Sequence, residues 1–295
     1  MGLRLFFNLL QQSLICKKSG LQVDLKSEKH EFELVQKLKK MKKIAVVLAL
    51  LAGLGFGCSP KTQESATGLD SLGTGTQAEN ALTPEEQAEG WILLFDGNSM
   101  QGWRAFNGDT TPANWVIEEG AMKGLGATGG ADFGGDVVYG GQEFEEFELK
   151  FSWKISSGGN SGVFYHVVEG PAYKAPYYTG PEYQVIDQLG FAQPLEKWQS
   201  LAGDYAMYEP DYAGVVKPAG EWNESKIVFS EAGASYWLNG KQTVAFVPYS
   251  EDWNTRRNSG KWNDFPDYKI ARKGLIALQD HGDPVWYKNI KIRPL

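Results

Sequence analysis

The stretch FELKFSWKI, residues 147–155, decides the fold class of this chain. Its apolar residues are Phe147, Leu149, Phe151, Trp153 and Ile155, and its polar residues are Glu148, Lys150, Ser152 and Lys154. Successive side chains of a β-strand point to opposite faces of a sheet, so this alternation places a core on one face and water on the other. The pattern predicts a half-buried β-strand.

Further short runs of apolar and β-branched residues have the same character. They lie at 91–97, 162–168, 181–187, 225–230, 235–239, 242–247, 274–280 and 285–292. Asn239-Gly240 separates two of them, and both residues tolerate the positive φ of a type I′ hairpin turn. Many short strands without βαβ alternation predict an all-β fold, an antiparallel β-sandwich or jelly roll.

Helical patterns are restricted to two segments. TPEEQAEGW (83–91) begins with Thr83 as N-cap and carries a capping-box glutamate three residues later, and PLEKWQSLAGD (194–204) is the second segment. Two long connections rich in Gly, Pro, Tyr and Trp lie at 170–180 and 248–270. Loops of this length in a compact domain are usually functional, so we expect them to form walls of a binding site.

A secretory signal begins at Met41 and not at Met1. MKKIAVVLALLAGLGFGC (41–58) has two lysines, an apolar run too short to span a bilayer, and small residues before Cys58. Its end resembles the lipobox of bacterial lipoproteins, with departures at Gly55 and Phe56; an uncleaved anchor is the alternative. We interpret 1–40 as a misannotated extension, 41–57 as a lipoprotein signal peptide, Cys58 as the lipidated residue, 58–82 as a flexible tether and 83–295 as the domain.

Charge and cysteine content restrict the partners of the mature chain. Residues 1–57 hold 10 of the 29 basic and 4 of the 36 acidic residues, so the remainder has a formal charge of −13. Such a chain avoids nucleic acids and anionic lipids, so we expect it to reach the membrane of the bacterial cell envelope through its lipid anchor only. Cys58 is the one cysteine left, which excludes a disulfide, a zinc–thiolate site and a cysteine nucleophile.

The first candidate site segment is SSGGNSGVFYHVVEG (156–170). The sequence has no P-loop, nucleophile elbow or HExxH motif, so the chemistry is sought on the predicted strands. Glycines surround Asn160 and Ser161, which either bind substrate hydroxyls or satisfy their own turn. Further along the strand, His166 is expected to share a face with Gly162.

The second segment, GPEYQVIDQLG (180–190), places Glu182 and Gln184 on one strand face. A carboxylate and an amide about 7 Å apart can contact one sugar ring together. Asp187 is expected to point to the opposite face. A solvated strand face is the simpler explanation for an isolated glutamate, but the neighbouring tyrosines favour a pocket.

Two further segments contribute a histidine and a tryptophan. KGLIALQDHGD (273–283) places Gln279 and His281 on one face at the end of a strand. A lone histidine is often only a hydrogen-bonded cap, but His281 is the better neutral-pH proton acceptor of the two histidines after Cys58. The other segment is EWNESKIVFS (221–230), in which Trp222 either stacks on the CH surface of a sugar or belongs to the core.

Several ordered motifs also resemble a known family, the 3-keto-disaccharide hydrolase domain. They are WILLFDGNSMQGW (91–103), GGNSGVFYHV (158–167), PEYQVID (181–187), EWNESKIVF (221–229), YWLNGKQTV (236–244) and GLIALQDHGDPVWYKNIKI (274–292). The resemblance implies a concanavalin A-like jelly roll and a secreted or lipid-anchored bacterial enzyme that acts on oxidised sugars. His166 departs from the family pattern, which more often has Arg at this position.

A ketone at C3 of a sugar acidifies the C2 proton, and loss of that proton gives an enolate from which the aglycone leaves at C1. We therefore expect a hydrolase or lyase in which Glu182 and His281 share the roles of base and acid. The substrate-binding candidates are Asn160, His166, Gln184, Gln279 and Trp222. A divalent cation could polarise the ketone, although the sequence shows no dedicated ligand cluster.

Two other functions remain open on the same predicted fold. A conventional glycosidase would use two carboxylates, for instance Glu182 and Asp187, although PEYQVID lacks the paired acids of laminarinase-type glucanases. A non-catalytic carbohydrate-binding lipoprotein would need aromatic and amide side chains but no residue that transfers protons.

Overall fold

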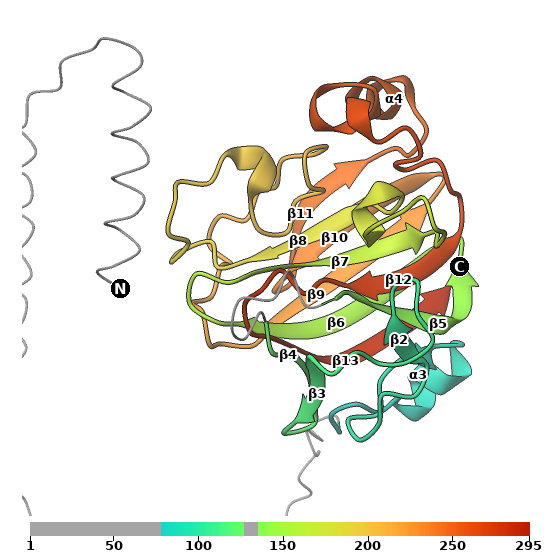
Figure 1. Ribbon diagram of the computed structural model, residues 1–295, viewed down its shortest axis with the longest axis vertical. Coiled ribbons are helices and arrows are strands. Elements are labelled where there is room, and N and C mark those ends of the chain that lie inside the picture. Colours follow the sequence, from blue (N-terminus) through green and yellow to red (C-terminus); the bar gives the residue numbers. More distant parts are fainter. Residues whose placement is uncertain (1–77, 127–134) are drawn as a thin grey trace, which may run out of the picture. The chain divides into compact units, whose positions relative to one another are not determined.

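Two antiparallel β-sheets packed face to face form the part of the chain that the computed structural model describes, residues 78–126 and 135–295 (Figure 1). The expected N-terminal extension, signal peptide, Cys58 and tether up to residue 77 lie outside these residues. Within the described ranges, no helix is long and apolar enough to cross a membrane. The predicted antiparallel sandwich of the concanavalin A-like, jelly-roll class is confirmed.

The larger sheet has the strand order β11-β10-β9-β6-β13-β4-β3, and β1 also pairs with β13. Its strands are β1 (Ile92–Leu93), β3 (Trp115–Glu118), β4 (Ala121–Gly124), β6 (Phe147–Ile155), β9 (Asn223–Ser230), β10 (Gly233–Leu238), β11 (Lys241–Phe246) and β13 (Val285–Pro294). Strand β6 has the predicted bounds, and its five apolar side chains are at most 3% exposed. The alternation in 147–155 therefore places one side of this sheet against the core.

The smaller sheet has the strand order β2-β5-β12-β7-β8. Its strands are β2 (Trp103–Ala105), β5 (Val137–Phe144), β7 (Asn160–Val167), β8 (Glu182–Ile186) and β12 (Gly274–Leu278). One face of this sheet packs on the larger sheet, with Val163, Tyr183 and Ile276 in the main core. On the opposite face, Phe164 and Ala277 belong to a separate apolar cluster. The outer face is therefore only partly apolar, and it is the face that carries the candidate site.

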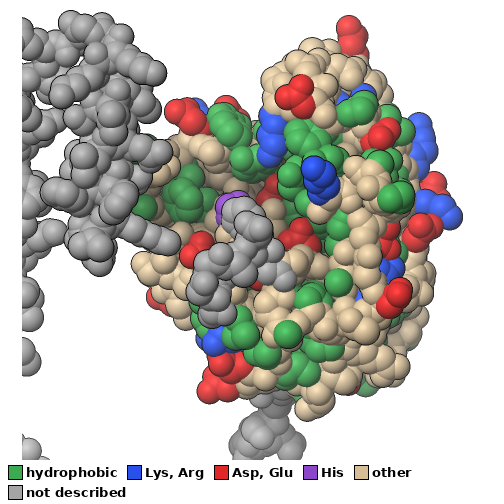
Figure 2. All heavy atoms as spheres, in the orientation of Figure 1, with side chains coloured by type: hydrophobic (Ala, Val, Ile, Leu, Met, Phe, Trp, Pro, Cys, Tyr) green, Lys and Arg blue, Asp and Glu red, His purple; other side chains and the backbone are tan. Residues whose placement is uncertain are grey.

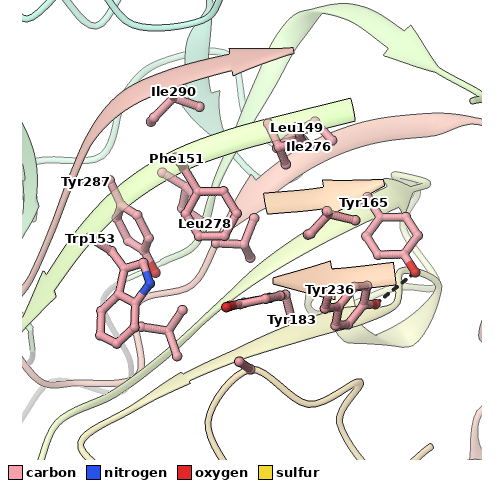
Figure 3. Close-up of a cluster of buried hydrophobic side chains, with 14 of the residues drawn as sticks. Leu149, Phe151, Trp153, Tyr165, Tyr183, Tyr236, Ile276, Leu278, Tyr287 and Ile290 are labelled. Carbon is pink, nitrogen blue, oxygen red and sulfur yellow. Dashed lines mark hydrogen bonds between the residues drawn. The ribbon is translucent and has the colours of Figure 1, made fainter. Parts of the chain in front are cut away.

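Aromatic side chains fill the space between the sheets (Figure 3). The hydroxyls of Tyr165 on β7 and Tyr236 on β10 form a hydrogen bond of 2.9 Å. The hydroxyl of Tyr183 on β8 lies 2.8 Å from Oγ of Ser225 on β9. Buried rings contribute large apolar areas, and these bonds remove the free-energy penalty of burying the hydroxyls. These two bonds connect β7 and β8 to the larger sheet across the core.

Local turn and cap signals in the sequence are confirmed. Asn239 and Gly240 both have positive φ, 48° and 84°, as a type I′ turn requires. Helix α3 (Pro84–Ala88) begins at the N-cap Thr83, and Glu86 completes the capping box. Such signals depend only on neighbouring residues, so the sequence predicts them directly.

Other local predictions are wrong. The segment 194–204 forms only the short 3₁₀ turn η2 (Lys197–Gln199), and strands β2 to β5 were not predicted. Helix α4 (Glu251–Arg257) was also missed, although Ser250 caps its first turn through the Trp253 N–H. This helix buries only Trp253, so it lacks an apolar stripe with helical period. The remaining 3₁₀ turns are η1 (Pro176–Tyr178) and η3 (Gly260–Asp264).

A β-bulge in β7 changes the face of His166. Phe164 pairs with Ala277 and Val167 pairs with Leu275, so Tyr165 and His166 together face the single residue between those partners. His166 takes the left-handed φ of 53°. The predicted alternation therefore ends at Tyr165, and Val167 takes the outward place expected for His166.

Candidate active site

A pocket of about 710 Å³ lies on the outer face of the smaller sheet. The predicted site residues Asn160, Glu182, Gln184, Gln279 and His281 all line it. Both long connections contribute to its wall, as expected: the first through Lys174, Ala175, Tyr177 and Tyr178, and the second through Lys261. Figure 2 shows acidic and hydrophobic side chains close to a histidine near the middle of the visible face. Residues from distant parts of the sequence therefore meet at one concave site.

The carboxyl group of Glu182 is a buried wall of the pocket. Glu182 is 5% exposed, and its side chain extends over Gly162 of the neighbouring strand β7. A Cβ atom at Gly162 would lie 2.5 Å from Oε1 of Glu182. The backbone N–H of Tyr205 donates to the Glu182 carbonyl at 3.1 Å, which fixes the free edge of β8. A side chain at position 162 would therefore displace this carboxyl group.

Three amide side chains in the pocket offer oxygen atoms without a hydrogen-bond partner among the described residues. These atoms are Oδ1 of Asn160, Oε1 of Gln184 and Oε1 of Gln279. Gln184 is 2% exposed, and its Nε2 donates to the Gln199 carbonyl at 3.2 Å, which fixes the orientation of the amide. Buried acceptors without donors are unfavourable. Hydroxyl groups of a bound sugar would supply the missing donors.

Two aspartates that the sequence reasoning missed also line the pocket, Asp136 and Asp280. The backbone N–H of Asp280 donates to Oδ1 of Asp136 at 2.9 Å. Asp280 in turn accepts hydrogen bonds from the Asn114 amide and from the Gly282 N–H. Asp136 precedes β5 and Asp280 follows β12, so only the pairing of these strands brings them together. The motif QDHGD (279–283) could have drawn attention to Asp280, whereas it does not include Asp136.

Burial shifts the pKa values of two of these carboxyl groups towards neutrality. Burial raises the pKa of Glu182 to about 8, which the Lys261 ammonium opposes and the charge of Asp136 reinforces. Burial likewise raises the pKa of Asp136 to about 7, against the backbone hydrogen bond from Asp280. Carboxyl groups with pKa values near the working pH are suited to general acid–base catalysis.

His281 lies at the exposed part of the pocket, just after β12. The cavity therefore contains both a solvent-accessible imidazole, that of His281, and a buried carboxyl group, that of Glu182. This arrangement can donate and accept protons at two points of a bound molecule. Both side chains line this one cavity, and their catalytic roles stay a prediction.

His166 does not reach the pocket, contrary to expectation. The bulge turns it into the core, where it is 2% exposed and its ring lies 4.7 Å from that of Phe229. Its Nε2 is 2.8 Å from the Glu145 carbonyl. Burial lowers the pKa of His166 to about 4, so the ring is neutral at physiological pH. We therefore assign His166 to the core and not to substrate binding.

Trp222 and two other polar residues also lie apart from the pocket. The ammonium groups of Lys288 and Lys154 lie over the Trp222 ring, 4.3 and 5.2 Å from its centroid. Asp187 points away as predicted and accepts hydrogen bonds from the Gly158 and Gly190 N–H groups. Ser161 donates to the Gln279 carbonyl at 2.7 Å, so it is structural. None of these three residues lines the pocket.

No group of three or more His, Cys, Asp or Glu side chains within residues 78–126 and 135–295 is arranged to hold a metal ion. The carboxyl groups of Asp136 and Asp280 accept hydrogen bonds from backbone and amide donors. The divalent cation considered from the sequence therefore has no assigned ligands here.

This jelly-roll sandwich with its pocket of carboxyl, amide and aromatic side chains is assigned to the class of carbohydrate hydrolases by its relatives. More specifically, the chain belongs to the 3-keto-alpha-glucoside-1,2-lyase-like domain family, whose model matches residues 90–293. The family resemblance predicted from the sequence motifs is thus confirmed.

Individual relatives agree with this assignment. A 3-keto-disaccharide hydrolase of Bacteroides thetaiotaomicron is 30% identical over 232 residues, which cover 70% of this chain and 79% of the relative. A proposed glycosyl hydrolase from Parabacteroides distasonis, known from a crystal structure, is 44% identical with a TM-score of 0.68. The match covers 74% of this chain and 100% of the Parabacteroides chain. A second proposed glycosyl hydrolase of that organism is 25% identical with a TM-score of 0.50, covering 65% and 99% of the two chains.

Proposed function

We propose that this protein cleaves the glycosidic bond of 3-keto-glycosides, including 3-keto-disaccharides, by removing the proton at C2 of the oxidised sugar. The observation that carries this proposal is the meeting of Glu182 and His281 in one pocket with three amide oxygens that lack donors. A ring with several hydroxyls satisfies such acceptors. The named activity of the Bacteroides relative supports the same substrate class.

Glu182 is the base in this mechanism. Because burial raises its pKa to about 8, its ionised form is a stronger base than an ordinary carboxylate. It takes the C2 proton, and the electrons of the C2–H bond form a C2=C3 bond while the ketone oxygen becomes an enolate oxygen. Gln184, Gln279 and Asn160 hold the sugar hydroxyls during this step.

His281 acts on the leaving group. The enolate collapses back to the ketone, a C1=C2 bond forms, and the C1–O bond to the aglycone breaks. His281 lies at the exposed part of the pocket, where it can protonate the departing oxygen. Addition of water to the resulting enone completes a hydrolysis, and release of the enone is a lyase reaction.

Product analysis with 3-keto and unoxidised glucosides tests the proposal. We expect cleavage of the 3-keto substrate alone, loss of turnover in Glu182→Gln and His281→Ala, and normal turnover in the control Glu224→Gln, an exposed residue outside the pocket. A parallel reaction with a chelator tests the divalent cation. Cleavage of the unoxidised glucoside would indicate a conventional glycosidase, and binding without product would indicate a binding protein.

We also propose that the mature protein is a lipoprotein of the cell envelope, attached through Cys58. The signal-like segment 41–57 and the polar stretch after Cys58 support this. Expression in a bacterial host with labelled palmitate should label the wild-type membrane fraction and not the Cys58→Ser variant. Equal labelling of the two would contradict the proposal.

A further inference from the structure

Lys261 is a cation of the pocket that neither the sequence motifs nor the proposed mechanism uses. It lies in η3, within the long connection 248–270, and it lines the cavity that contains Glu182. Its Nζ lies 4.3 Å from the ring centroid of Tyr205, 4.8 Å from that of Trp262 and 5.4 Å from that of Tyr177. Aromatic faces attract an ammonium group, so three rings hold this one in place.

The two lysines that are strongly buried among the described residues are neutralised by carboxylates. The buried Lys269 is paired with Asp204, and Lys291 is paired with Glu86. Among the residues that the structure describes, by contrast, Lys261 has ring contacts but no ion pair or hydrogen bond. Its three N–H donors are therefore available to a ligand in the pocket.

The chemistry of the pocket requires such a cation. Glu182, Asp136 and Asp280 line the same pocket as Lys261, and carboxyl groups repel a developing negative charge once they are ionised. An ammonium group in a partly buried site offsets that repulsion more strongly than it would in water. Lys174 also lines the pocket but is exposed and has no ring contact among the described residues. Lys261 is thus the better placed of the two lysines.

Resting on the function proposed above, we propose that Lys261 is the catalytic residue that stabilises the enolate, by donating a hydrogen bond to the C3 oxygen. As Glu182 takes the C2 proton, the C3 oxygen changes from a neutral carbonyl to an anion, and the ammonium group remains protonated throughout. When the C1–O bond breaks, the negative charge passes to the aglycone oxygen and is neutralised there by a proton. Lys261 therefore acts in the transition state more than in the ground state.

Single-turnover kinetics on a 3-keto-glucoside, with and without deuterium at C2, tests this role. We expect Lys261→Met to lower the single-turnover rate roughly 100-fold, the usual effect of removing one oxyanion donor, with little change in substrate binding. The C2-deuterium isotope effect of the wild type should persist or increase in this variant. Lys261→Arg should retain part of the rate, because it keeps the charge. The matched control is Lys154→Met, which removes a lysine that also lies over two aromatic rings but outside the pocket and should react as the wild type does.

The possible failures are distinguishable. A wild-type single-turnover rate in Lys261→Met, or loss of the isotope effect in a slowed variant, would overturn the role of Lys261 while leaving the proposed function intact. Absence of cleavage by the wild-type protein would instead overturn the proposed function. If Lys261→Met does not fold by circular dichroism, Lys261→Gln gives the same test with a polar side chain.

Discussion

Gly162 on β7 makes room for the carboxyl group of Glu182 on β8. Gly162 pairs in register with Gln184, so the side chain of Glu182, two residues earlier, extends across the backbone of the glycine. A methyl group at position 162 would lie 2.9 Å from Cγ and 2.5 Å from Oε1 of Glu182. The position of the proposed base thus depends on the absence of a side chain on the next strand.

Gly162→Ala should lower kcat on a 3-keto-glucoside by about 10- to 100-fold, because a small displacement of a reacting group is costly. The fold should persist with a loss of about 1–3 kcal/mol in the free energy of unfolding, as for other overpacked sites. Gly233→Ala is the control, since a Cβ there would meet only a carbonyl oxygen at 3.9 Å. Steady-state kinetics and urea unfolding of both variants measure the two effects. Equal activity of the two variants would contradict the role of Gly162.

The pH dependence of catalysis should follow the ionisation of Glu182. A base must be ionised, and burial raises the pKa of this group to about 8. His281 acts only on the later departure of the aglycone, so the rate of C2-proton removal is the quantity that reports on Glu182. We expect this rate to rise with pH and to level off above about 8, where the carboxylate form dominates. Single-turnover measurements with C2-deuterated substrate between pH 5 and 9.5 check this. A deuterium-sensitive rate that falls above pH 8 would instead show that Glu182 acts as the acid.

Glu182→Gln should stabilise the protein at neutral and alkaline pH. The folded pKa of about 8 lies above the ordinary value of 4.5, so folding favours the protonated form. This stabilisation is complete below pH 4.5 and is lost as the pH rises through 8. The glutamine is always neutral, so its advantage should grow to roughly 4 kcal/mol at pH 8 and vanish near pH 4.5. Urea unfolding at both pH values, with Glu224→Gln as control, measures the difference; a pH-independent difference would contradict it.

His166 should make the fold sensitive to mild acid. Burial lowers its pKa from the ordinary 6.5 to about 4, so the folded state holds the neutral ring. Its contribution is fully present above pH 6.5 and is lost as the pH falls through 4. Between pH 7.5 and 5 this amounts to about 2 kcal/mol of unfolding free energy. His166→Asn, which tolerates the left-handed backbone, should lose about 2 kcal/mol less over this interval in urea unfolding. An identical pH dependence of the variant would refute this.

The buried ion pair of Lys269 and Asp204 should be important for the stability of the fold. Both side chains are fully buried. The backbone N–H of Lys269 donates to the Thr179 carbonyl at 2.7 Å. Lys269→Met leaves an uncompensated buried carboxylate, so we expect a loss of about 3–5 kcal/mol in the free energy of unfolding. The double variant Lys269→Met/Asp204→Asn should recover much of this loss, because no buried charge remains. Urea unfolding measures both, and a double variant as unstable as the single one would contradict the argument.

Part of this protein could be predicted from short-range patterns. The alternation in 147–155 predicts strand β6, and Asn239-Gly240 predicts the hairpin of β10 and β11. Strand faces and turn dihedrals depend on residues that are close in sequence. The same period of two places Glu182 and Gln184 on one face. These are local properties of the backbone, so they require no knowledge of the partner strands.

The tertiary structure alone decided which side chains meet in the site. The bulge that removes His166 from the outer face is a property of the pairing between β7 and β12, and the sequence of β7 by itself continues the alternation. Asp136 and Lys261 join the pocket through strand pairing and a long connection, without any motif that marks them. The raised pKa of Glu182 arises from burial among distant residues. Register, burial and charge in a cavity are long-range quantities, whereas a sequence pattern reports only what neighbouring residues prefer.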